Sequence, residues 1–374
     1  MEEGILRRTE DEQVQIAGAG PAGLAAAITL ATAGRQVVVH EAHRQVGHRF
    51  GGDLQGLENW TGERDALEAL RDLGITTDFE TLPCCEGQAF DPWGRAYPVR
   101  SERPLFYMVE RGPGHTSLDS ALLRQALAVG VEVRFGSRVR TLEGPAILAT
   151  GPRIADAVAT GYHFTTDMDD GFWIICDDRL APRGYAYLLV MKGRGTVKTC
   201  LFDRLSDTRR YVERTVAAFE RLVGLRMIDP RPHGGAGNFH IPVTALEGNN
   251  PVAGEQAGFQ DTLWGFGIHL AIQSGVLAAR CLLEGAAADY DRRWRQAFGP
   301  LLEASVVNRA VYSLLGNRGY RWGLRLQAKR DARLLLQRTY RPSRLKRRLF
   351  PLARWRYRSK RTTAPGAAPG CSSA

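Results

Sequence analysis

The chain has 374 residues, of which 44% are hydrophobic and 24% are charged. This length allows two domains, and the composition is ordinary for a globular protein whose core needs no metal or disulfide. The six cysteines show no C-x-x-C spacing, which argues against a redox or zinc motif and against a secreted disulfide framework. No run of about 18 apolar residues occurs, so we expect no transmembrane helix, and the acidic, polar residues 1–12 do not resemble a signal peptide. We expect a cytoplasmic protein with reduced thiols.

The formal net charge of +10 is concentrated near the C-terminus. Residues 318–361 contain seventeen Lys and Arg side chains and one acid, Asp331, which gives this segment +16 and leaves −6 for the rest of the chain. The body of the protein is therefore mildly acidic, and the basic segment needs an explanation of its own.

The first predicted elements form a βαβ unit. Residues 14–17 are an apolar strand, residues 24–33 are rich in Ala and Leu and predict a helix, and residues 37–39 predict a second strand, closed by Glu41. The turn between strand and helix has G-x-G-x-x-G spacing. Its candidate cofactor-binding residues are Gly18, Gly20, Pro21, Ala22 and Gly23.

This spacing is typical of a dinucleotide-binding turn. Gly18 permits the tight turn, Gly20 lets a backbone N–H approach a pyrophosphate, and Gly23 lets the helix pack against the strand. The helix N-terminus adds unpaired N–H groups that favour phosphate. Glu41 can accept hydrogen bonds from adenosine ribose hydroxyls, and its charge would repel the 2′-phosphate of NADP. An ordinary glycine-rich turn is the alternative, and this unit does not distinguish FAD from NAD.

The remaining chain alternates helices and strands. Residues 42–60 predict a loop, and residues 74–110 predict short strands separated by Pro and Gly. Alternating apolar and polar residues in 162–203 are typical of an antiparallel sheet. Further strands are expected at 131–135 and 146–149, a glycine-rich strand and loop at 252–267, and helices at 63–73, 117–129, 207–223 and 268–283. Residues 289–361 predict helices with breaks near 299–300, Pro342 and Pro351, and residues 362–374 predict a disordered tail.

A second glycine-rich segment carries a family resemblance. Residues 254–268, GEQAGFQDTLWGFGI, resemble the G-D-A-A-G-x-x-D-P-x-x-G-x-G-I segment of the geranylgeranyl reductase family, within the flavoproteins related to aromatic hydroxylases. The resemblance implies FAD as the cofactor. In that family the acid after the first glycine binds the flavin ribityl chain, and the Gly-x-Gly-Ile turn lies along the isoalloxazine edge. The corresponding candidates are Gly254, Glu255, Asp261, Gly265, Gly267 and Ile268.

Weaker matches to the same family occur in the same order. Arg111 followed by residues 117–119 resembles its R-x(n)-[FL]-D-x-x-L segment, and residues 149–152 take the place of its A-D-G strand end, with Gly151 as the glycine. Residues 182–187 resemble its P-x-x-Y-x-W motif. Thr150 replaces the Asp of A-D-G, which in related hydroxylases helps to organise flavin and nicotinamide. This departure argues against a hydroxylase fed by NADPH.

The loop after the second predicted strand contains Arg49, Gly51 and Gly52. This fold brings that part of the chain past the flavin, so a basic side chain there could meet the pyrophosphate and a glycine pair could admit the ring. An ordinary loop is the alternative.

Tyr185, Tyr187 and Trp264 are candidates for lining an apolar substrate cavity. Aromatic residues in a sheet are often simply core, which is the alternative for the two tyrosines. Trp264 is the better candidate, because it stands between residues that the resemblance assigns to the flavin.

No set of residues predicts a metal site, because the histidines show no ligand spacing. His269, in the first turn of the helix after the second glycine segment, is the candidate proton donor. The adjacent Cys84 and Cys85 are expected to be structural or buried, since no base is visibly paired with them.

The basic segment, Arg318 to Arg361, suits an anionic membrane surface. Leu345, Leu349, Leu352 and Trp355 fall at helical spacing with Arg and Lys between them, so apolar side chains could enter the interface while basic ones meet phosphates. A solvated basic face and a nucleic-acid partner are the alternatives, and nucleic acid is the least favoured.

We therefore expect an α/β fold with a Rossmann-type FAD-binding domain, an inserted antiparallel-sheet substrate domain and a helical C-terminal extension. The expected boundaries are 1–60, 105–160 and 245–285 for the FAD-binding domain, 61–104 and 161–244 for the substrate domain, 286–361 for the basic helical extension, and 362–374 for the tail.

The expected function is that of an FAD-dependent oxidoreductase that reduces or desaturates carbon–carbon bonds of an apolar, isoprenoid- or lipid-like substrate by flavin N5 hydride transfer. The electron donor is left open among NAD(P)H, ferredoxin and quinone. A monooxygenase or halogenase on the same scaffold is the first alternative, although the W-x-W-x-I-P signature of flavin halogenases is absent from the sequence. A flavin-binding protein associated with membrane or nucleic acid, without redox turnover, is the alternative from another class.

Overall fold

The computed structural model describes residues 13–358 except 140–141, 143, 153–154 and 206. The acidic residues 1–12 and the predicted disordered tail, 362–374, lie outside the described residues.

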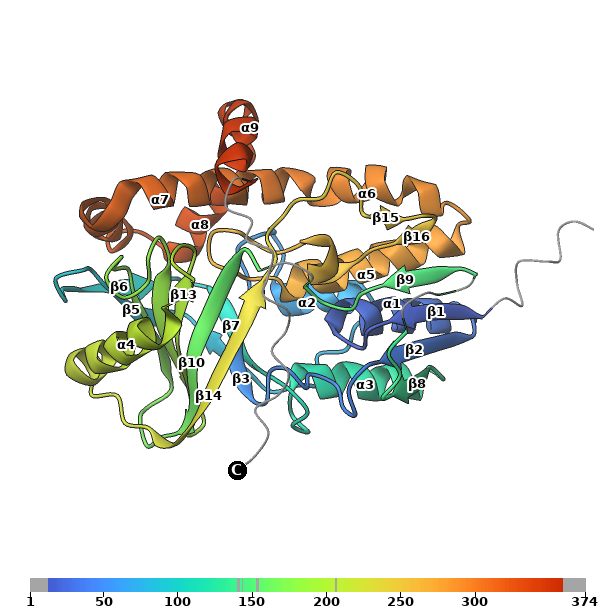
Figure 1. The fold of residues 1–374 in the computed structure, drawn as a ribbon, viewed down its shortest axis with the longest axis horizontal. Coiled ribbons are helices and arrows are strands. Elements are labelled where there is room, and N and C mark those ends of the chain that lie inside the picture. The colour runs from blue at the N-terminus through green and yellow to red at the C-terminus, as the bar shows by residue number, and fades with distance from the viewer. Residues whose placement is uncertain (1–12, 140–141, 143, 153–154, 206, 359–374) are drawn as a thin grey trace, which may run out of the picture.

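A four-stranded parallel sheet forms the first layer, in the order β8-β2-β1-β9 (Figure 1). Its strands are β1 (Val14–Ala17), β2 (Val37–Glu41), β8 (Glu132–Phe135) and β9 (Ala146–Leu148). The mostly buried helix α1 (Pro21–Thr32) packs against α3 (Leu118–Ala128) and α5 (Ile268–Leu283). Gly275 of α5 lies so close to α1 that an added Cβ would be 2.0 Å from the Ala22 carbonyl oxygen. The predicted βαβ unit and the predicted helix 268–283 are confirmed.

A seven-stranded sheet forms the second layer, in the order β14-β10-β13-β12-β11-β5-β6. All neighbours are antiparallel except β11 and β5. Helix α4 (Thr208–Val223) covers one face, where Phe219 packs against Leu188 and Val197. The strands are β5 (Glu86–Phe90), β6 (Ala96–Arg100), β10 (Ala157–Thr165), β11 (Gly171–Ile175), β12 (Tyr185–Met191), β13 (Arg194–Leu201) and β14 (Ile228–Gly237).

A three-stranded antiparallel sheet joins the two layers, in the order β3-β7-β4. It consists of β3 (Asp53–Glu58), β7 (Phe106–Arg111) and β4 (Thr81–Cys84). Short elements complete this part of the fold: α2 (Ala66–Asp72), the β15 (Leu246–Glu247) and β16 (Asn250–Pro251) pair, and the 3-10 turn η1 (Gly254–Ala257). Helix α2 begins at an Asp65 cap and packs through Ala66 and Leu70 into the core of the first layer.

The C-terminal extension lies along one side of both layers (Figure 1). Its main helices are α6 (Tyr290–Ala297), α7 (Gly299–Gln327), α8 (Ala332–Tyr340) and α9 (Arg344–Arg358). Breaks occur near 299–300 and Pro342 as predicted, but the predicted break at Pro351 is wrong, because α9 continues through this residue. An unpredicted kink occurs in α7 at Gly316, whose φ of +56° suits glycine. None of the helices in the described part of the chain has the length and apolar character needed to cross a membrane.

Candidate active site

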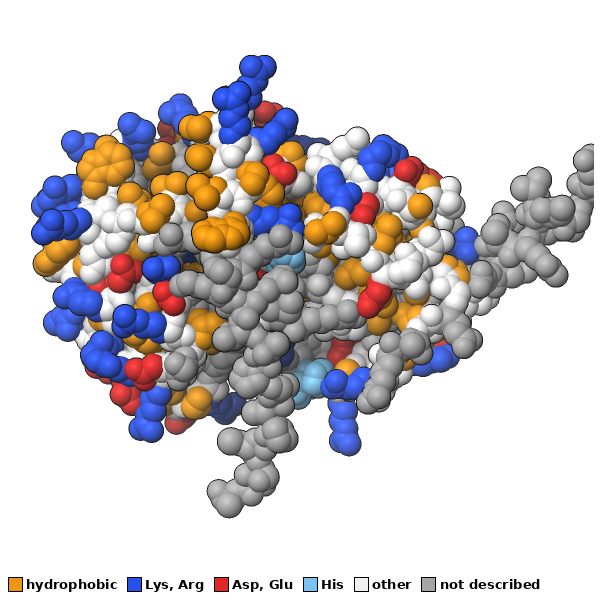
Figure 2. All heavy atoms as spheres, turned by 45° about the horizontal axis from the view of Figure 1, so that its top comes forward, with side chains coloured by type: hydrophobic (Ala, Val, Ile, Leu, Met, Phe, Trp, Pro, Cys, Tyr) orange, Lys and Arg blue, Asp and Glu red, His pale blue; other side chains and the backbone are white. Residues whose placement is uncertain are grey.

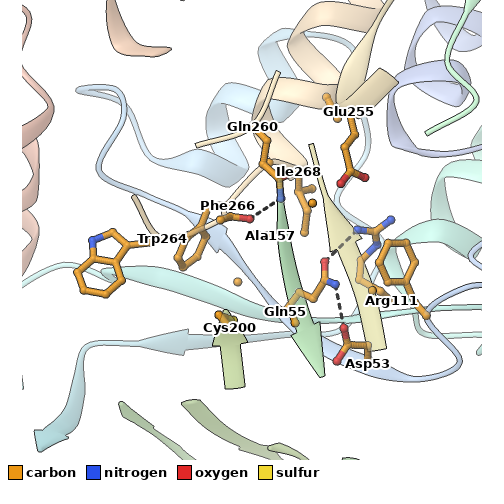
Figure 3. Close-up of a pocket in the computed structure, with 18 of the residues that line it drawn as sticks. Asp53, Gln55, Arg111, Ala157, Cys200, Glu255, Gln260, Trp264, Phe266 and Ile268 are labelled. Carbon is orange, nitrogen blue, oxygen red and sulfur yellow. Dashed lines mark hydrogen bonds between the residues drawn. The ribbon is translucent and has the colours of Figure 1, made fainter. Parts of the chain in front are cut away.

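A continuous cavity of about 480 Å³ lies between the two layers. Its walls come from the turn after β1, the loop after β2, the segment 253–268 and the face of the seven-stranded sheet that carries Lys198 and Cys200. Leu324, Leu335 and Leu336 of α7 and α8 also line it, and Leu324 and Leu336 pack with its apolar side chains. Figure 3 shows side chains from these separate parts of the sequence converging on one space.

The glycines of the first turn occupy three different environments. Gly18 has a φ of +102°, and an added Cβ would be 2.3 Å from the Ala149 carbonyl oxygen. An added Cβ at Gly23 would be 1.9 Å from the Gly18 carbonyl oxygen, whereas one at Gly20 would meet no atom within 4 Å. Gly18 and Gly23 are therefore needed for close backbone packing, and Gly20 leaves open space at the N-terminus of α1. Pro21 and Ala22 also line the cavity.

Glu41, at the end of β2, lies at the cavity and braces the first turn. One carboxylate oxygen accepts a 3.0 Å hydrogen bond from Ala19 N, and the other accepts a 2.9 Å bond from His43 N. The carboxylate is thus held beside the turn, in the position where a ribose ligand was expected.

The second glycine segment meets the first turn across the cavity. Gly254 has a φ of +63°, and its N–H donates a 2.9 Å hydrogen bond to Ser274 Oγ of α5. Gln260 Nε2 donates a 2.7 Å bond to the Gly265 carbonyl oxygen, which fixes the turn before α5 (Figure 3). The candidate residues of this segment that line the cavity are Gly254, Glu255, Gly265, Gly267 and Ile268.

The two candidate arginines line the cavity but already have partners. Arg49 forms an ion pair with Glu255, and its guanidinium lies 4.6 Å from the centre of the Phe50 ring. Arg111 donates two hydrogen bonds to Asp119, of 2.8 and 2.9 Å, and one of 3.1 Å to Gln55 Oε1. Both cations are thus held in place at the cavity wall. Gly151 lies on the same wall.

The remaining candidates lie behind the lining. Asp261 is buried, and its carboxylate accepts hydrogen bonds from Leu263 N (3.0 Å) and Trp264 N (2.7 Å), so it shapes the second turn from within. Burial raises the pKa of Asp261. Gly23 lies under the first turn, and Gly51 and Gly52 form a bend in which Gly52 N donates to the Arg111 carbonyl oxygen.

Arg309 of α7 supports the second turn from outside the cavity, and sequence reasoning missed it. This fully buried guanidinium donates to the Thr262 carbonyl oxygen at 3.0 Å, to Leu263 O, and to Arg183 O at 2.9 Å. It also lies 3.8 Å from the centre of the Phe202 ring. A single side chain of the helical extension therefore holds the turn that carries Trp264.

The three aromatic candidates lie together at the cavity. The Tyr185 hydroxyl donates to the Trp264 carbonyl oxygen, and the two rings are 5.1 Å apart in an edge-on arrangement. Tyr187 lies beside Tyr185 on β12, with ring centres 6.2 Å apart. Beyond them the cavity is apolar, lined by Ala89, Val99, Leu105, Phe106, Phe172, Ile174 and Leu189.

A buried charged cluster lies on the sheet side of the cavity. Lys198 Nζ is 2.5 Å from Asp53 Oδ2, and both side chains are at most 3% exposed. Gln55 Nε2 donates a 2.9 Å hydrogen bond to the same Asp53 oxygen (Figure 3), and His163 Nε2 lies 3.2 Å from the other. Burial alone would raise the pKa of Asp53, but the Lys198 charge and the His163 hydrogen bond hold it well below its ordinary value. Asp53 is therefore ionised at neutral pH.

The second histidine of this cluster, His233, lies against His163 with ring centres 4.1 Å apart and the ring planes tilted by 32°. Burial and then the Lys198 charge lower the pKa of His233, so this imidazole is neutral at pH 7. Ligand atoms of Asp53, His163 and His233 lie within 4.8 Å of one another, close enough for a metal ion. Lys198 already pairs with this carboxylate and would repel a cation. The cluster is best described as a buried ion pair with two histidines, and the absence of a metal stays a prediction.

His269, Cys84 and Cys85 are not among the residues that line the cavity. Burial lowers the pKa of His269, the candidate proton donor, to about 4, so its imidazole is neutral at pH 7. Cys84 is buried as predicted, and burial raises its pKa to about 12, whereas Cys85 is half-buried.

The cavity has the features of a site for a phosphate-bearing cofactor with a polar ring. Helices α1 and α5 both begin at it, and neither start has a side-chain cap or an acid in its first turn among the described residues. The N-termini of both helices therefore direct the positive ends of their dipoles toward the cavity. Gln260 Oε1, His233 Nδ1 and Trp264 Nε1 are buried at the cavity without a hydrogen-bond partner in the described chain. These orphaned atoms need a polar ligand.

The comparisons with known proteins agree with this geometry. Residues 11–146 match the FAD binding domain family, and this stretch includes the first turn, Glu41 and Arg111. A comparison with curated proteins found no match to the chain. FAD is therefore the cofactor that the residues of the cavity fit.

Solved structures share the fold over nearly the whole chain. A geranylgeranyl bacteriochlorophyll reductase-like protein from Thermoplasma acidophilum has a TM-score of 0.72 and 16% identity, covering 91% of this chain and 99% of that one. The flavin-dependent brominase Bmp2 has a TM-score of 0.66 and 15% identity, covering 94% and 100%. The myxobacterial chondrochloren halogenase CndH has a TM-score of 0.60 and 18% identity, covering 92% and 96%. The predicted fold class and the flavoprotein resemblance are confirmed, but one fold serves several reactions here.

Proposed function

We propose that this chain, an FAD-dependent oxidoreductase, reduces or desaturates a carbon–carbon bond of an apolar, isoprenoid- or lipid-like substrate. The observation that supports the proposal most is the continuity of the cavity. Its polar half lies between the two glycine turns, and its other half is lined almost entirely by aliphatic and aromatic side chains. A long apolar molecule would be desolvated there next to the cofactor.

The residues that would hold FAD follow from the two turns. Gly18, Gly20 and the start of α1 suit the pyrophosphate, and Glu41 suits the adenosine ribose. Glu255 suits the ribityl chain. The turn at Gly265 and Gly267, with the positive end of α5, suits the polar edge of the flavin ring. When bound, FAD supplies hydride transfer in either direction, together with storage of two electrons.

The protein must also manage one proton, because reduction of a double bond adds a hydride and a proton. Lys198 is the side chain that we assign to this task. It lines the cavity, and ionised Asp53 fixes its position from behind. His233, neutral and on the same wall, is held by the 2.7 Å contact of its Nε2 with the Arg49 carbonyl oxygen in the loop after β2, and its Nδ1 has no partner in the described chain. Tyr185, Tyr187 and Trp264 would hold the substrate and exclude water.

A second function, oxygenation or halogenation, is favoured by one observation. The fold is shared with proteins described as a flavin-dependent brominase and a halogenase. The electron donor stays open among NAD(P)H, ferredoxin and quinone. The composition of the product distinguishes the functions whatever the donor.

The test uses the purified holoenzyme, reduced anaerobically with dithionite and mixed with geranylgeranyl lipid. Mass spectrometry is expected to find product that has gained two hydrogen atoms for each reduced double bond. Parallel reactions would contain air, with and without bromide. A product that gains an oxygen atom or a halogen, with none that gains hydrogen, would refute the proposal in favour of the second function.

A variant separates chemistry from cofactor binding. Lys198→Met paired with Asp53→Asn removes both charges of the ion pair, so neither is left buried alone. We expect the FAD absorbance of this double variant to be retained and hydrogen addition to be lost. Unchanged turnover would remove Lys198 from the proposed role.

A further inference from the structure

Exposed apolar side chains gather on the C-terminal helices. Trp322 is 62% exposed, and Leu345, Leu352 and Trp355 are 66 to 67% exposed. Figure 2, in which the side with α7 to α9 faces forward, shows apolar side chains interspersed with Lys and Arg there. We define the docking face as the outward side chains of Trp322, Leu326, Leu334, Leu345, Leu349, Leu352 and Trp355.

The exposed apolar residues of α9 do not result from a helix that has failed to pack against the protein. The helix is anchored by its opposite side, where Phe350 and Ala353 pack against the main hydrophobic core. Arg354 donates a 3.2 Å hydrogen bond to the Ile241 carbonyl oxygen. The rigid attachment of one side leaves Leu345, Leu349 and Leu352, spaced by four and three residues, directed away from the protein.

The segment that carries the docking face is almost entirely positive in its charged side chains, with Asp331 as its one acid. Exposed basic side chains on these helices and the turns between them include Arg325, Lys329, Arg338, Arg341, Arg344, Arg347 and Arg348. The one acid of the segment, Asp331, is already used. Its carboxylate caps α8 by accepting a 2.7 Å hydrogen bond from Leu334 N, and it accepts a 2.8 Å bond from Glu102 N.

We propose that the docking face binds the surface of an anionic lipid bilayer. Leu and Trp side chains would enter the boundary between headgroups and acyl chains, while the surrounding Arg and Lys contact lipid phosphates. The helices would lie along the bilayer, in keeping with their lack of a spanning segment in the described chain.

The apolar composition favours lipid over the other partners of basic helices. Duplex nucleic acid would meet the charges but would leave Leu345 and Leu352 against phosphate or water. Single-stranded nucleic acid could stack on Trp322 and Trp355, but it would gain nothing from the five exposed leucines of the face. A second copy of the chain would bring two strongly basic faces together, and like charges repel.

Docking would also place the apolar end of the cavity next to the bilayer, an extension that rests on the proposed function. Leu324, Leu335 and Leu336 line that end. They belong to the same two helices that carry Trp322, Leu326 and Leu334 on the exposed side. Only α7 and α8 would then lie between the bilayer surface and the apolar part of the cavity.

The test is flotation of the full chain, loaded with FAD, with vesicles of phosphatidylcholine containing about 30% phosphatidylglycerol, and with pure phosphatidylcholine. The test variant is Leu345→Ser, Leu352→Ser and Trp355→Ser. Its matched control changes three exposed apolar residues elsewhere, as Leu127→Ser, Phe135→Ser and Ile228→Ser. Bound FAD reports that each variant is folded.

The expected result is flotation of the wild-type protein and the control with anionic vesicles, and at least roughly tenfold weaker binding of the test variant. Arg347→Glu with Arg348→Glu, or high salt, should weaken binding to anionic vesicles only. Equal binding of wild type and test variant, or no flotation of the wild type, would overturn the proposal. Retention on RNA, or a dimer by sedimentation, in place of vesicle binding would overturn it in favour of those partners. No substrate is present, so docking can succeed even where the proposed reaction fails.

Discussion

Glu58, at the end of β3, is a buried acid whose charge state should control stability. Its side chain is 1% exposed, and neither carboxylate oxygen has a hydrogen-bond partner among the described residues. Burial, with a smaller contribution from the charge of Asp261, raises the pKa of Glu58 to about 8 from an ordinary value of 4.5. We predict that Glu58→Gln removes the fall in stability that Glu58 itself causes between these two values.

The sign follows from where the proton is held. Between pH 4.5 and about 8 the folded protein keeps a proton that the unfolded chain releases, so the free energy of unfolding falls as pH rises through this window and then levels off. The difference of about 3.5 between the two pKa values sets an upper limit of about 5 kcal/mol. The glutamine side chain of the variant would be neutral at every pH. Its unpaired amide lowers stability by a constant amount, so the slope with pH is the quantity to compare.

The assay is urea unfolding of wild type and Glu58→Gln at about pH 5, 6, 7 and 8, with saturating FAD at each pH. The variant should gain several kcal/mol relative to wild type between the lowest and highest pH. The exposed Glu63→Gln serves as control and should follow the wild type. Parallel curves for wild type and Glu58→Gln over the whole range would refute the reasoning, because Glu58 would then be ionised in the folded protein.

Three further predictions concern the cavity. Gly20→Val should fold normally and bind FAD at least roughly tenfold more weakly, because its side chain enters the open space at the start of α1. Gly23→Val should instead lower the melting temperature, because its Cβ collides with Gly18. Flavin absorbance and thermal unfolding distinguish the two variants. Lys198→Met paired with Asp53→Asn should lower turnover by roughly 10²- to 10⁴-fold. Lys192→Met, in the exposed turn between β12 and β13, should not, and an equal effect of both would contradict the assignment. Arg309→Met should weaken FAD binding by freeing the turn after Asp261, and normal binding titrated by flavin fluorescence would contradict this.

The parts of the fold that the sequence predicts are those with strong local signals. Residues 14–41 were expected to be strand, glycine turn, helix and strand, because the apolar runs and the glycine spacing have few other uses, and the structure has β1, α1 and β2 there. Helix α5 follows its glycine turn with the expected bounds. Strand β14 was missed, because two prolines and three glycines within residues 228–237 argue against a strand. Its position at the sheet edge makes both residue types acceptable.

The charged cluster could not be predicted, because it depends on strand register. Lys198 of β13 and His233 of β14 both pair with Gly161 of β10, although 37 and 72 positions separate them from it. Gly161 fits because an added Cβ would be 1.8 Å from the Val197 carbonyl oxygen. Asp53 then approaches from a different sheet. The spacing of these residues along the chain contains no sign of this arrangement.

The helical extension was predicted as a separate C-terminal element, but its contacts make it part of the candidate active site. Arg309 holds the turn before α5, Leu324 and Leu336 line the cavity, and Trp322 and Leu352 belong to the docking face. Deleting the chain from residue 318 would therefore open the cavity and remove the basic face in one step, so loss of activity after deletion would say nothing about membrane binding. Substitutions at outward positions, which leave Arg309 and Leu324 in place, separate the two roles. The test variant of the docking face should lose vesicle binding and keep turnover on detergent-solubilised lipid. In that case the inner side chains of the helical extension line the cavity, and its outer side chains bind the membrane.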